Sequence, residues 1–287
     1  LGGFVAVGFC GCILSFIIYK CGTDWIDVVL PPAAMGPVVA LIGLELSSSA
    51  ASNAGLLDDK LDMRNVIVFL VTLGVAVFGN ILFRGFLSVI PILIAVIAGY
   101  LTALGCGILD FSKVASASWF ALPNFTMAKF DTGAILMILP VLLVITSEHI
   151  GHQVVTSKIV GRDLLKTPGL HRSLFGDNFS TMISGLIGSV PTTTYGENIG
   201  VMAVTKVYSV RVIAGAAVLS IICSFVGKLS MLIQTIPGPV IGGISFLLYG
   251  MIGASGIRIL VDSQVDYGRS RNLTLTSVVF VTGLSEI

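Results

Sequence analysis

Two groups of ionisable residues lie inside long apolar stretches of this sequence, and both can carry chemistry. The first group contains Glu148, His149 and His152. On a helix Glu148 and His152 share one face because they are four residues apart, whereas His149 points about 100° away from Glu148. A carboxyl group next to an imidazole can exchange a proton, or the two can form a buried structural hydrogen bond. The spacing favours Glu148 and His152 over His149 as functional residues.

The second group lies at the end of an interruption of an apolar stretch at residues 189–196. Tyr195, Gly196 and Glu197 lie where a new short helix is expected to begin. Gly196 lets the backbone approach a ligand closely, and the first N–H groups of the helix can donate hydrogen bonds. Together with the carboxylate of Glu197, they suit a flat ligand that has both N–H and C=O groups. The alternative is that Glu197 only caps the helix.

The composition indicates where these groups lie. Hydrophobic residues make up 55% of the 287 residues and charged residues 11%, whereas soluble domains contain roughly 25% charged residues. Such a chain cannot cover itself with a polar surface, so we expect an integral membrane protein. The net charge of +1 argues against nucleic-acid binding, and the five scattered cysteines form no metal-binding pattern. An ionisable group inside a span is unfavourable by about 2.5–3.5 kcal/mol, which makes both groups candidates for a functional site.

Apolar segments of spanning length recur along the chain, since a spanning helix needs roughly 20 apolar residues. The interrupted stretch is expected to cross twice, as short spans at 178–190 and 195–206 joined by irregular, β-like backbone near 190–197. If the stretch crosses twice, most basic residues of the sequence, including those of the loop 156–177, lie on the cytoplasmic side, as the positive-inside rule expects. If it crosses once, the basic residues are divided almost evenly between the two sides. The predicted fold is all-α with about ten spans or parts of spans. The other expected spans are 1–19, 32–50, 65–83, 87–109, 133–155, 208–233, 238–261 and 272–287.

A weak internal repeat predicts the symmetry of this fold. Residues 31–36 resemble residues 237–242, and each copy follows a span that contains Ser-Phe and ends in lysine. An odd number of spans separates the copies, so they have opposite orientations, as in the inverted repeats of secondary transporters. The same symmetry predicts three spans before residue 1 and one after residue 287, and it interprets the sequence as a fragment of a protein with fourteen spans.

Residues from Glu197 to Lys206 resemble the signature of the nucleobase–ascorbate transporter family. That signature has Gln, Glu or Pro, then Asn, any residue, Gly, four residues, Thr and a basic residue. This sequence supplies every fixed position, with Asn198, Gly200 and Thr205 between the two ends. The resemblance covers the whole chain. Similarity to the bacterial uracil permease branch of the family extends to residues 31–36, 148–152, 193–198 and 253–258.

The resemblance implies fourteen spans in two inverted repeats of seven, divided into a core domain that holds the substrate and a gate domain that dimerises. It also implies a multi-pass protein of the bacterial cytoplasmic membrane that forms a homodimer through its gate. The implied division is part of the core at 1–20, the first half of the gate at 21–110, the core with the substrate site at 133–233, and the second half of the gate at 238–287.

The resemblance further implies a proton-coupled importer of uracil, with no cofactor other than the coupling proton and no enzymatic activity. Glu197 and Glu148 would bind the pyrimidine, together with the backbone at Tyr195 and Gly196. Relatives that transport purines usually carry Gln at the position of Glu197, so the glutamate favours uracil. A purine, xanthine or broader nucleobase permease is the alternative within the family.

The same resemblance assigns the proton coupling to a polar network. His152 and Tyr249 would join Glu148 in it. The fragment alone is expected not to transport, because the family places a further broken span across from residues 191–197, before the first residue of this sequence.

Two interpretations from other classes are weighed against the transporter. Glu148, His149 and His152 could donate metal ligands in an intramembrane metalloenzyme. Their order differs from the His-Glu-x-x-His of zinc proteases, and no further ligand stands out. An exchanger of inorganic anions is disfavoured, because two carboxylates in the site would repel its substrate.

Overall fold

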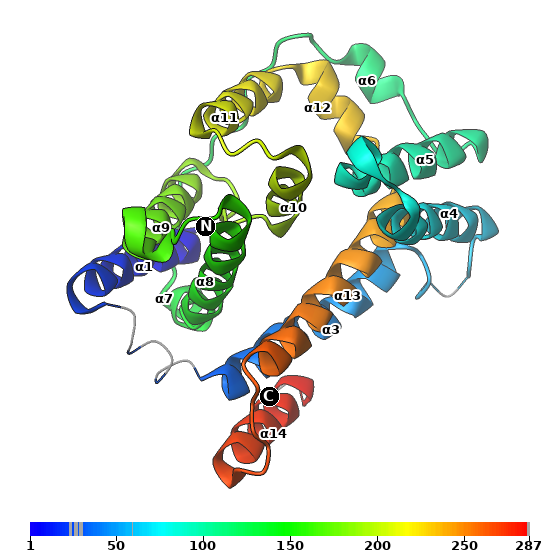
Figure 1. The fold of residues 1–287 in the computed structure, drawn as a ribbon. Helices are drawn as coiled ribbons and strands as arrows, with labels where there is room; N and C mark the ends of the chain where they lie inside the picture. The colour runs from blue at the N-terminus through cyan, green and yellow to red at the C-terminus, as the bar shows by residue number, and fades with distance from the viewer. Residues whose placement is uncertain (23–24, 26–27, 29–30, 59, 286–287) are drawn as a thin grey trace. The chain divides into compact units, whose positions relative to one another are not determined.

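The computed structural model describes residues 1–22, 25, 28, 31–58 and 60–285, with the side chains of residues 113, 197 and 204 outside the description. The regular elements within these ranges are helices (Figure 1). In chain order they are α1 (Gly2–Cys21), α3 (Pro32–Asn53), α4 (Met63–Leu82), η1 (Gly85–Val89), α5 (Pro91–Gly105), α6 (Ser112–Ser116), α7 (Thr132–Ile138), α8 (Val141–Val160), η2 (Leu165–Gly169), α9 (Leu170–Ile187), α10 (Gly196–Thr205), α11 (Val210–Ser224), α12 (Gly227–Gln234), α13 (Gly238–Asp262) and α14 (Ser270–Leu284).

Several helices have the length and composition of membrane spans. Helices α5 and α11 are also apolar but shorter. Helix α14 covers residues 272–284 of the expected span at 272–287, and the last two residues of that span lie outside the described ranges. The expected spans at 1–19, 32–50, 65–83, 133–155 and 238–261 are confirmed, and with them the all-α membrane class. Within the described ranges, the segments that are long and apolar enough to cross are Gly2–Cys21, Pro32–Asn53, Met63–Leu82, Thr132–Val160 and Gly238–Asp262.

Two expected spans are divided in the structure, and the confirmed span at 133–155 is interrupted at Pro140. The span at 87–109 becomes the 3-10 turn η1 and helix α5, which begins at Pro91 because proline suits the first helical position. In the span at 133–155, Pro140 separates α7 from α8, since proline has no N–H for the helix. The span at 208–233 divides into α11 and α12, and Val226 between them pairs with Phe120 in an isolated β-bridge.

Helix α9 shows that the predicted short span at 178–190 is wrong in extent. It begins at Leu170 and has 18 residues, which is about 27 Å of helix. Because α8 continues to Val160, most of the predicted loop 156–177 is also helical. A polar side chain of α9 can find its partner within the same helix. Asn178, for example, donates from Nδ2 to the Leu174 carbonyl at 2.8 Å. Helix α10, Gly196–Thr205, lies within the second short span predicted at 195–206, and its crossing of the membrane stays a prediction.

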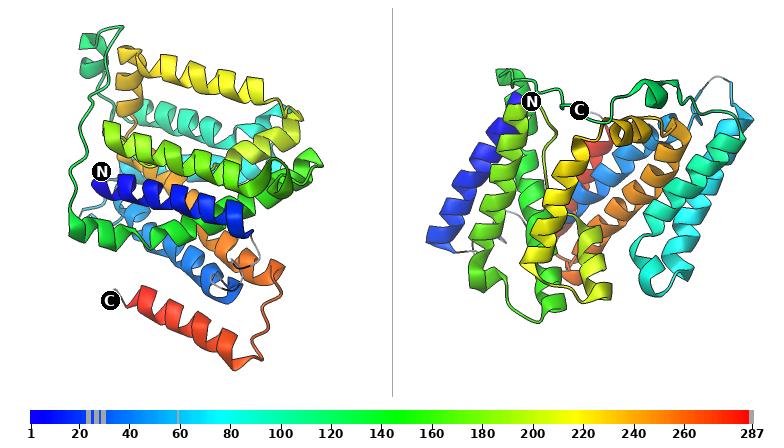
Figure 2. Two further views of the ribbon diagram at one scale, coloured as in Figure 1. Left: turned by 90° about the vertical axis from the view of Figure 1, so that its left-hand side faces the viewer. Right: turned by 90° about the horizontal axis from the view of Figure 1, so that it is seen from above.

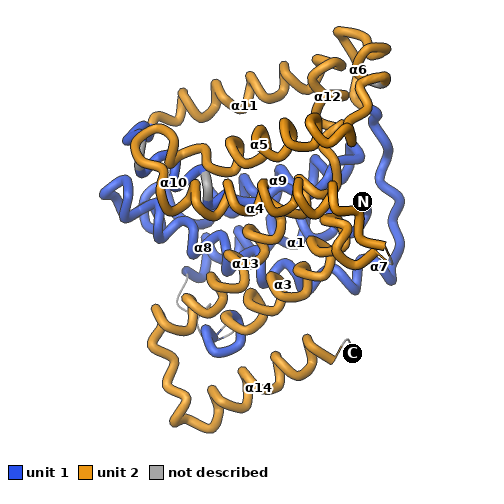
Figure 3. The backbone as a smooth tube through the Cα atoms, turned by 90° about the vertical axis from the view of Figure 1, so that its right-hand side faces the viewer, with its two compact units in different colours: residues 1–35, 124–208 blue, residues 36–123, 209–287 orange. Residues whose placement is uncertain are grey.

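The helices form two compact units (Figure 3). Unit 1 contains residues 1–35 and 124–208, and unit 2 contains residues 36–123 and 209–287. Residues 209–233, which the sequence analysis groups with 133–208, fall in unit 2. The reason is that α11 contacts α12, and none of the described residues of α11 is buried. The assignment of the units to a core and a gate domain stays a prediction.

Unit 1 depends on the close packing of α1 against α9 (Figure 2). A Cβ atom on Gly8 would lie 2.6 Å from the Asn178 carbonyl oxygen, and one on Gly11 would overlap the Asn178 side chain. Small residues let helix backbones approach in lipid, where the hydrophobic effect does not drive helices together. Leu170 and Leu174 of α9 are buried in a cluster with Ile18 of α1. This packing holds α9 beside the candidate site.

Unit 2 depends on α4, α5 and α13. Val68, Ala103 and Val240, one from each helix, are buried together. The hydroxyl group of Thr72 donates to the Val68 carbonyl at 2.7 Å, so this buried polar group is satisfied within its own helix. Helix α13 also approaches the end of α3 through Gly242, where a Cβ atom would lie 2.6 Å from the Ala54 nitrogen. Small residues therefore set the helix spacing in both units.

We predict that Gly8→Ala destabilises the protein, because the added methyl group meets the backbone of Asn178 and Met182 and separates α1 from α9. Overpacking of this kind is unfavourable by about 1–3 kcal/mol. The thermal midpoint of the purified full-length protein in detergent measures the effect. Gly176→Ala on α9 is the control, since its added Cβ has no neighbour within 4 Å. A Gly8→Ala midpoint equal to that of the wild type would contradict this account of the packing.

Candidate functional site

Helix α8 presents Glu148, His149 and His152 to different surroundings within unit 1. Glu148 is exposed on this unit, His152 is half-buried, and His149 is only 1% exposed. The Nδ1 atom of His152 lies 2.6 Å from the Oγ1 atom of Thr194. The structure therefore brings the second histidine of the group against the interruption that the sequence analysis singles out.

That interruption, residues 188–195, connects α9 to α10 and is called the irregular segment below. Helix α9 ends at Ile187 and is capped by Gly188, whose φ of 93° lies in the left-handed region, and the Ser189 N–H donates to the Ser184 carbonyl at 2.8 Å. The Thr126 N–H donates to the Ile187 carbonyl at 3.3 Å, which adds a partner at the same helix end. The predicted irregular backbone is confirmed and begins two residues earlier than expected.

Helix α9 supplies the second polar contact to the irregular segment. The hydroxyl group of Thr181, which is 4% exposed, donates to the Thr192 carbonyl at 2.7 Å. The same hydroxyl oxygen accepts from the Thr192 N–H at 3.2 Å. One side chain of α9 thus satisfies both backbone groups of Thr192.

Helix α10 begins at the candidate ligand-binding residues. Tyr195 is the N-cap with extended backbone (φ −106°, ψ 112°), and its side chain is 63% exposed. Gly196 is the first helical residue, and a Cβ atom there would lie 3.2 Å from Nε2 of His152. Glu197 follows in the first turn, and its side chain lies outside the described residues. The backbone of Gly196 therefore lies next to the His152 ring.

The family-signature positions lie along α10 and at its end. Asn198 and Gly200 are exposed on this helix. The Thr205 hydroxyl donates to the Val201 carbonyl at 2.8 Å, within the last turn. Lys206 is the C-cap residue, with a left-handed φ of 56°. The signature thus coincides with one short helix, from its first turn to its cap.

A buried polar cluster joins His149 to α9, and the sequence analysis missed its partners. The Nε2 atom of His149 lies 2.9 Å from Oγ of Ser173, and its Nδ1 atom lies 3.2 Å from Oδ2 of Asp177. The sequence assigned both partners to a loop, so it gave no signal for this contact. His149 points away from Glu148, as predicted, because it faces the neighbouring helix.

Tyr249 lies in unit 2, half-buried on α13. The other candidate residues lie in unit 1, so a polar network that includes Tyr249 stays a prediction. In unit 2, the backbone of Tyr249 lies where α13 packs on α3, because its carbonyl oxygen faces Gly43.

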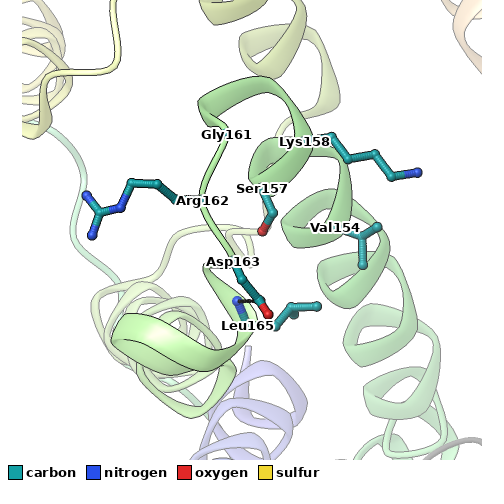
Figure 4. A pocket seen from close by; sticks show the side chains of 7 residues that line it. All are labelled: Val154, Ser157, Lys158, Gly161, Arg162, Asp163 and Leu165. Carbon is teal, nitrogen blue, oxygen red and sulfur yellow. Dashed lines mark hydrogen bonds between the residues drawn. The ribbon is translucent and has the colours of Figure 1, made fainter.

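Two further features bear on the candidate site, namely its capacity to bind a metal ion and an open hollow in unit 1. Among the described residues, no three His, Cys, Asp or Glu side chains are grouped so that they could hold a metal ion. An open hollow of about 420 Å³ lies at the C-terminal end of α8 (Figure 4). It contains none of the candidate residues and is lined by Val154, Ser157, Lys158, Gly161, Arg162, Asp163 and Leu165.

Comparison with known proteins gives strong similarity over the whole chain. Residues 1–287 match the family described as "Permease family". The chain is 55% identical over 288 residues to the uracil permease of Escherichia coli (strain K12), covering 99% of this chain and 67% of that protein. It is 53% identical over 291 residues to the uracil permease of Paenibacillus larvae, covering 99% and 69%. For the uracil permease of Bacillus subtilis the identity is 46% over 295 residues, covering 99% and 68%.

The apolar helices, the broken span and these similarities define a multi-pass membrane transporter. The chain belongs to the permease family that the sequence analysis names the nucleobase–ascorbate transporter family. It spans about two thirds of the length of the relatives it matches. Membership of this family confirms that the chain is part of a transporter and not an enzyme.

Proposed function

We propose that this chain holds the substrate site of a proton-coupled importer of uracil. The observation that carries the proposal is the contact between His152 and Thr194, because it joins the helix of Glu148 to the segment that precedes Glu197. That contact supports a single site formed by α8, the irregular segment and α10. The 55% identity to a uracil permease supports uracil as the ligand of this site. Purine and xanthine transport is the alternative within the family.

The chemistry of uracil fits the groups at the start of α10. Uracil is a flat, neutral ring with two N–H donors and two carbonyl acceptors. A carboxylate at position 197 accepts from the ring N–H groups, and the backbone N–H groups at Tyr195 and Gly196 donate to the carbonyl oxygens. A site of this kind rejects analogues that leave its polar groups unpaired, which accounts for selectivity among bases.

The coupling proton is proposed to move within a network of Glu148, His152 and Tyr249. Glu148 and His152 share a face of α8, and His152 also contacts the irregular segment. A change of charge on this face therefore acts directly on the segment that holds the base. Tyr249 joins from the other unit in this proposal.

The proposed architecture follows the inverted repeat of the sequence. Unit 1 holds most of the proposed core domain with the substrate site, which also includes residues 209–233 of unit 2, and most of unit 2 belongs to the gate domain that forms a homodimer. In this proposal the complete fold has two repeats of seven spans in the bacterial cytoplasmic membrane. The first repeat's broken span faces the irregular segment from the opposite side.

We predict that Glu197→Ala weakens uracil binding by at least about 10-fold and up to ~100-fold, because hydrogen bonds to a charged group contribute about 1.5–3 kcal/mol. Equilibrium binding of labelled uracil to the purified full-length protein measures the change. Glu45→Ala, which removes an exposed carboxylate of α3 in unit 2, is the control and should bind like the wild type. Unchanged affinity of the Glu197 variant would refute its role.

For coupling, Glu148→Gln is expected to abolish the stimulation of uracil uptake by an acidic exterior, since the amide cannot carry the proton. Uptake into proteoliposomes is measured over a range of external pH at fixed internal pH. Asp262→Asn, which alters an exposed pair with Arg258, should keep the wild-type profile. A Glu148 variant with the wild-type pH profile would exclude this residue from coupling.

A further expectation concerns the backbone at the start of α10. In Gly196→Ala the added methyl group lies 3.2 Å from Nε2 of His152, so the ring or the helix start must shift by a few tenths of an ångström. We expect uracil affinity to fall on the order of 10-fold, because small displacements in a site are costly. Gly215→Ala on α11, where an added Cβ has no neighbour within 4 Å, is the control. Equal affinities of both variants would contradict the close contact.

A further inference from the structure

Helix α9 carries a row of polar side chains that the proposed binding chemistry does not use. Ser173, Asp177 and Thr181 are spaced by four residues, so they lie on one face of the helix. Each has a partner outside α9. Ser173 and Asp177 contact the His149 ring on α8, and Thr181 contacts the backbone of Thr192. This row is called the α9 polar track below.

Ser173 and Asp177, at one end of the α9 polar track, fix the rotation of α8 about its own axis. His149 is almost completely buried, so its two ring nitrogens need partners, and a buried polar group without them is strongly unfavourable. Ser173 and Asp177 satisfy both nitrogens from one direction. Rotation of α8 would break both contacts at once. Because Glu148 and His152 are on the same helix, their direction is set by this pair of contacts.

Thr181, at the other end of the α9 polar track, holds the irregular segment in position. Residues 188–195 have left the helix, and their backbone groups need other partners at membrane depth. The Thr181 hydroxyl supplies two of these partners by donating to the Thr192 carbonyl and accepting from the Thr192 N–H. Thr192 precedes Gly196 by four residues, so its position determines where α10 begins.

The contacts close into a ring. From α8, His149 reaches Asp177 of α9, and one turn further along α9 Thr181 reaches Thr192. Two residues later Thr194 returns to α8 at His152. Each contact lies within unit 1, and together they connect both proposed ligand-binding groups to one helix.

We infer that Thr181 is a positioning residue for the nucleobase, which acts by holding the irregular segment on the α9 polar track. The inference rests on the proposed function and names a residue that the binding chemistry itself does not require. Thr181 does not touch the base in this account. It sets the place of the backbone N–H groups that do, while His149 sets the place of the carboxylate on α8.

Thr181→Val tests the inference, because valine keeps the shape of the side chain and removes the hydroxyl group. We expect uracil affinity of the full-length protein to fall about 10-fold or more, with a thermal midpoint close to that of the wild type. Thr181→Ser restores the hydroxyl group and is expected to bind within about threefold of the wild type. If the valine variant does not fold, Thr181→Ala replaces it in the comparison with serine.

The matched control is Thr146→Val on α8. Thr146 is as buried as Thr181 and lies in the same unit, but its hydroxyl group donates to the Leu142 carbonyl of its own helix at 2.7 Å. This variant is expected to keep wild-type affinity. A purely structural role of buried threonines would lower the affinity of both valine variants alike, and that result would overturn the inference.

A double variant adds a readout that general destabilisation would not produce. If the ring acts as one unit, His149→Asn combined with Thr181→Val weakens binding less than the product of the two single effects, because the first change has already opened the ring. Independent effects that multiply would contradict the ring.

Loss of binding in Glu197→Ala with unchanged binding in Thr181→Val would refute the positioning role and leave the proposed function intact. A folded wild-type protein that does not bind uracil would refute both.

Discussion

The need to satisfy backbone polar groups inside a membrane is the constraint on which this structure depends. A continuous helix meets it without help, but residues 188–195 leave the helix between α9 and α10. Their N–H and C=O groups then take partners from other elements. Beyond the left-handed turn at Gly188, the Ser184 carbonyl accepts from the Ser189 N–H, and the Thr181 hydroxyl pairs with both backbone groups of Thr192. A broken span is possible here because neighbouring helices supply hydrogen-bond partners for it.

The same constraint explains the packing of unit 1. Asp177 can reach His149 only if α9 lies close to α8 and is fixed in rotation. The glycines of α1 allow the Asn178 side of α9 to lie against the α1 backbone, which holds α9 in place from its other side. Tight helix packing and the polar site are therefore parts of one arrangement. In return, the break creates the start of α10, and the first N–H groups of a helix can donate to a ligand.

The sequence was sufficient for the features that apolar length and helix breakers determine. It predicted the spanning helices, the interruption before Gly196 and the short helix that follows it. It failed in the first half of α9, because the polar residues Ser173 and Asp177 resemble those of a loop when their partners are unknown. The sequence analysis also ranked His149 below Glu148 and His152, since the role of His149 depends on which helix packs beside it. Pairing between distant helices cannot be derived from the periodicity of one segment.

The most direct test of the central claim is binding of labelled uracil to the purified full-length protein, with excess unlabelled xanthine as competitor. The account predicts saturable binding that unlabelled uracil displaces and xanthine leaves intact, because the site is built to pair with the polar edge of a pyrimidine. Displacement by xanthine would contradict a pyrimidine-selective site. The absence of saturable binding to folded protein would contradict the substrate assignment itself.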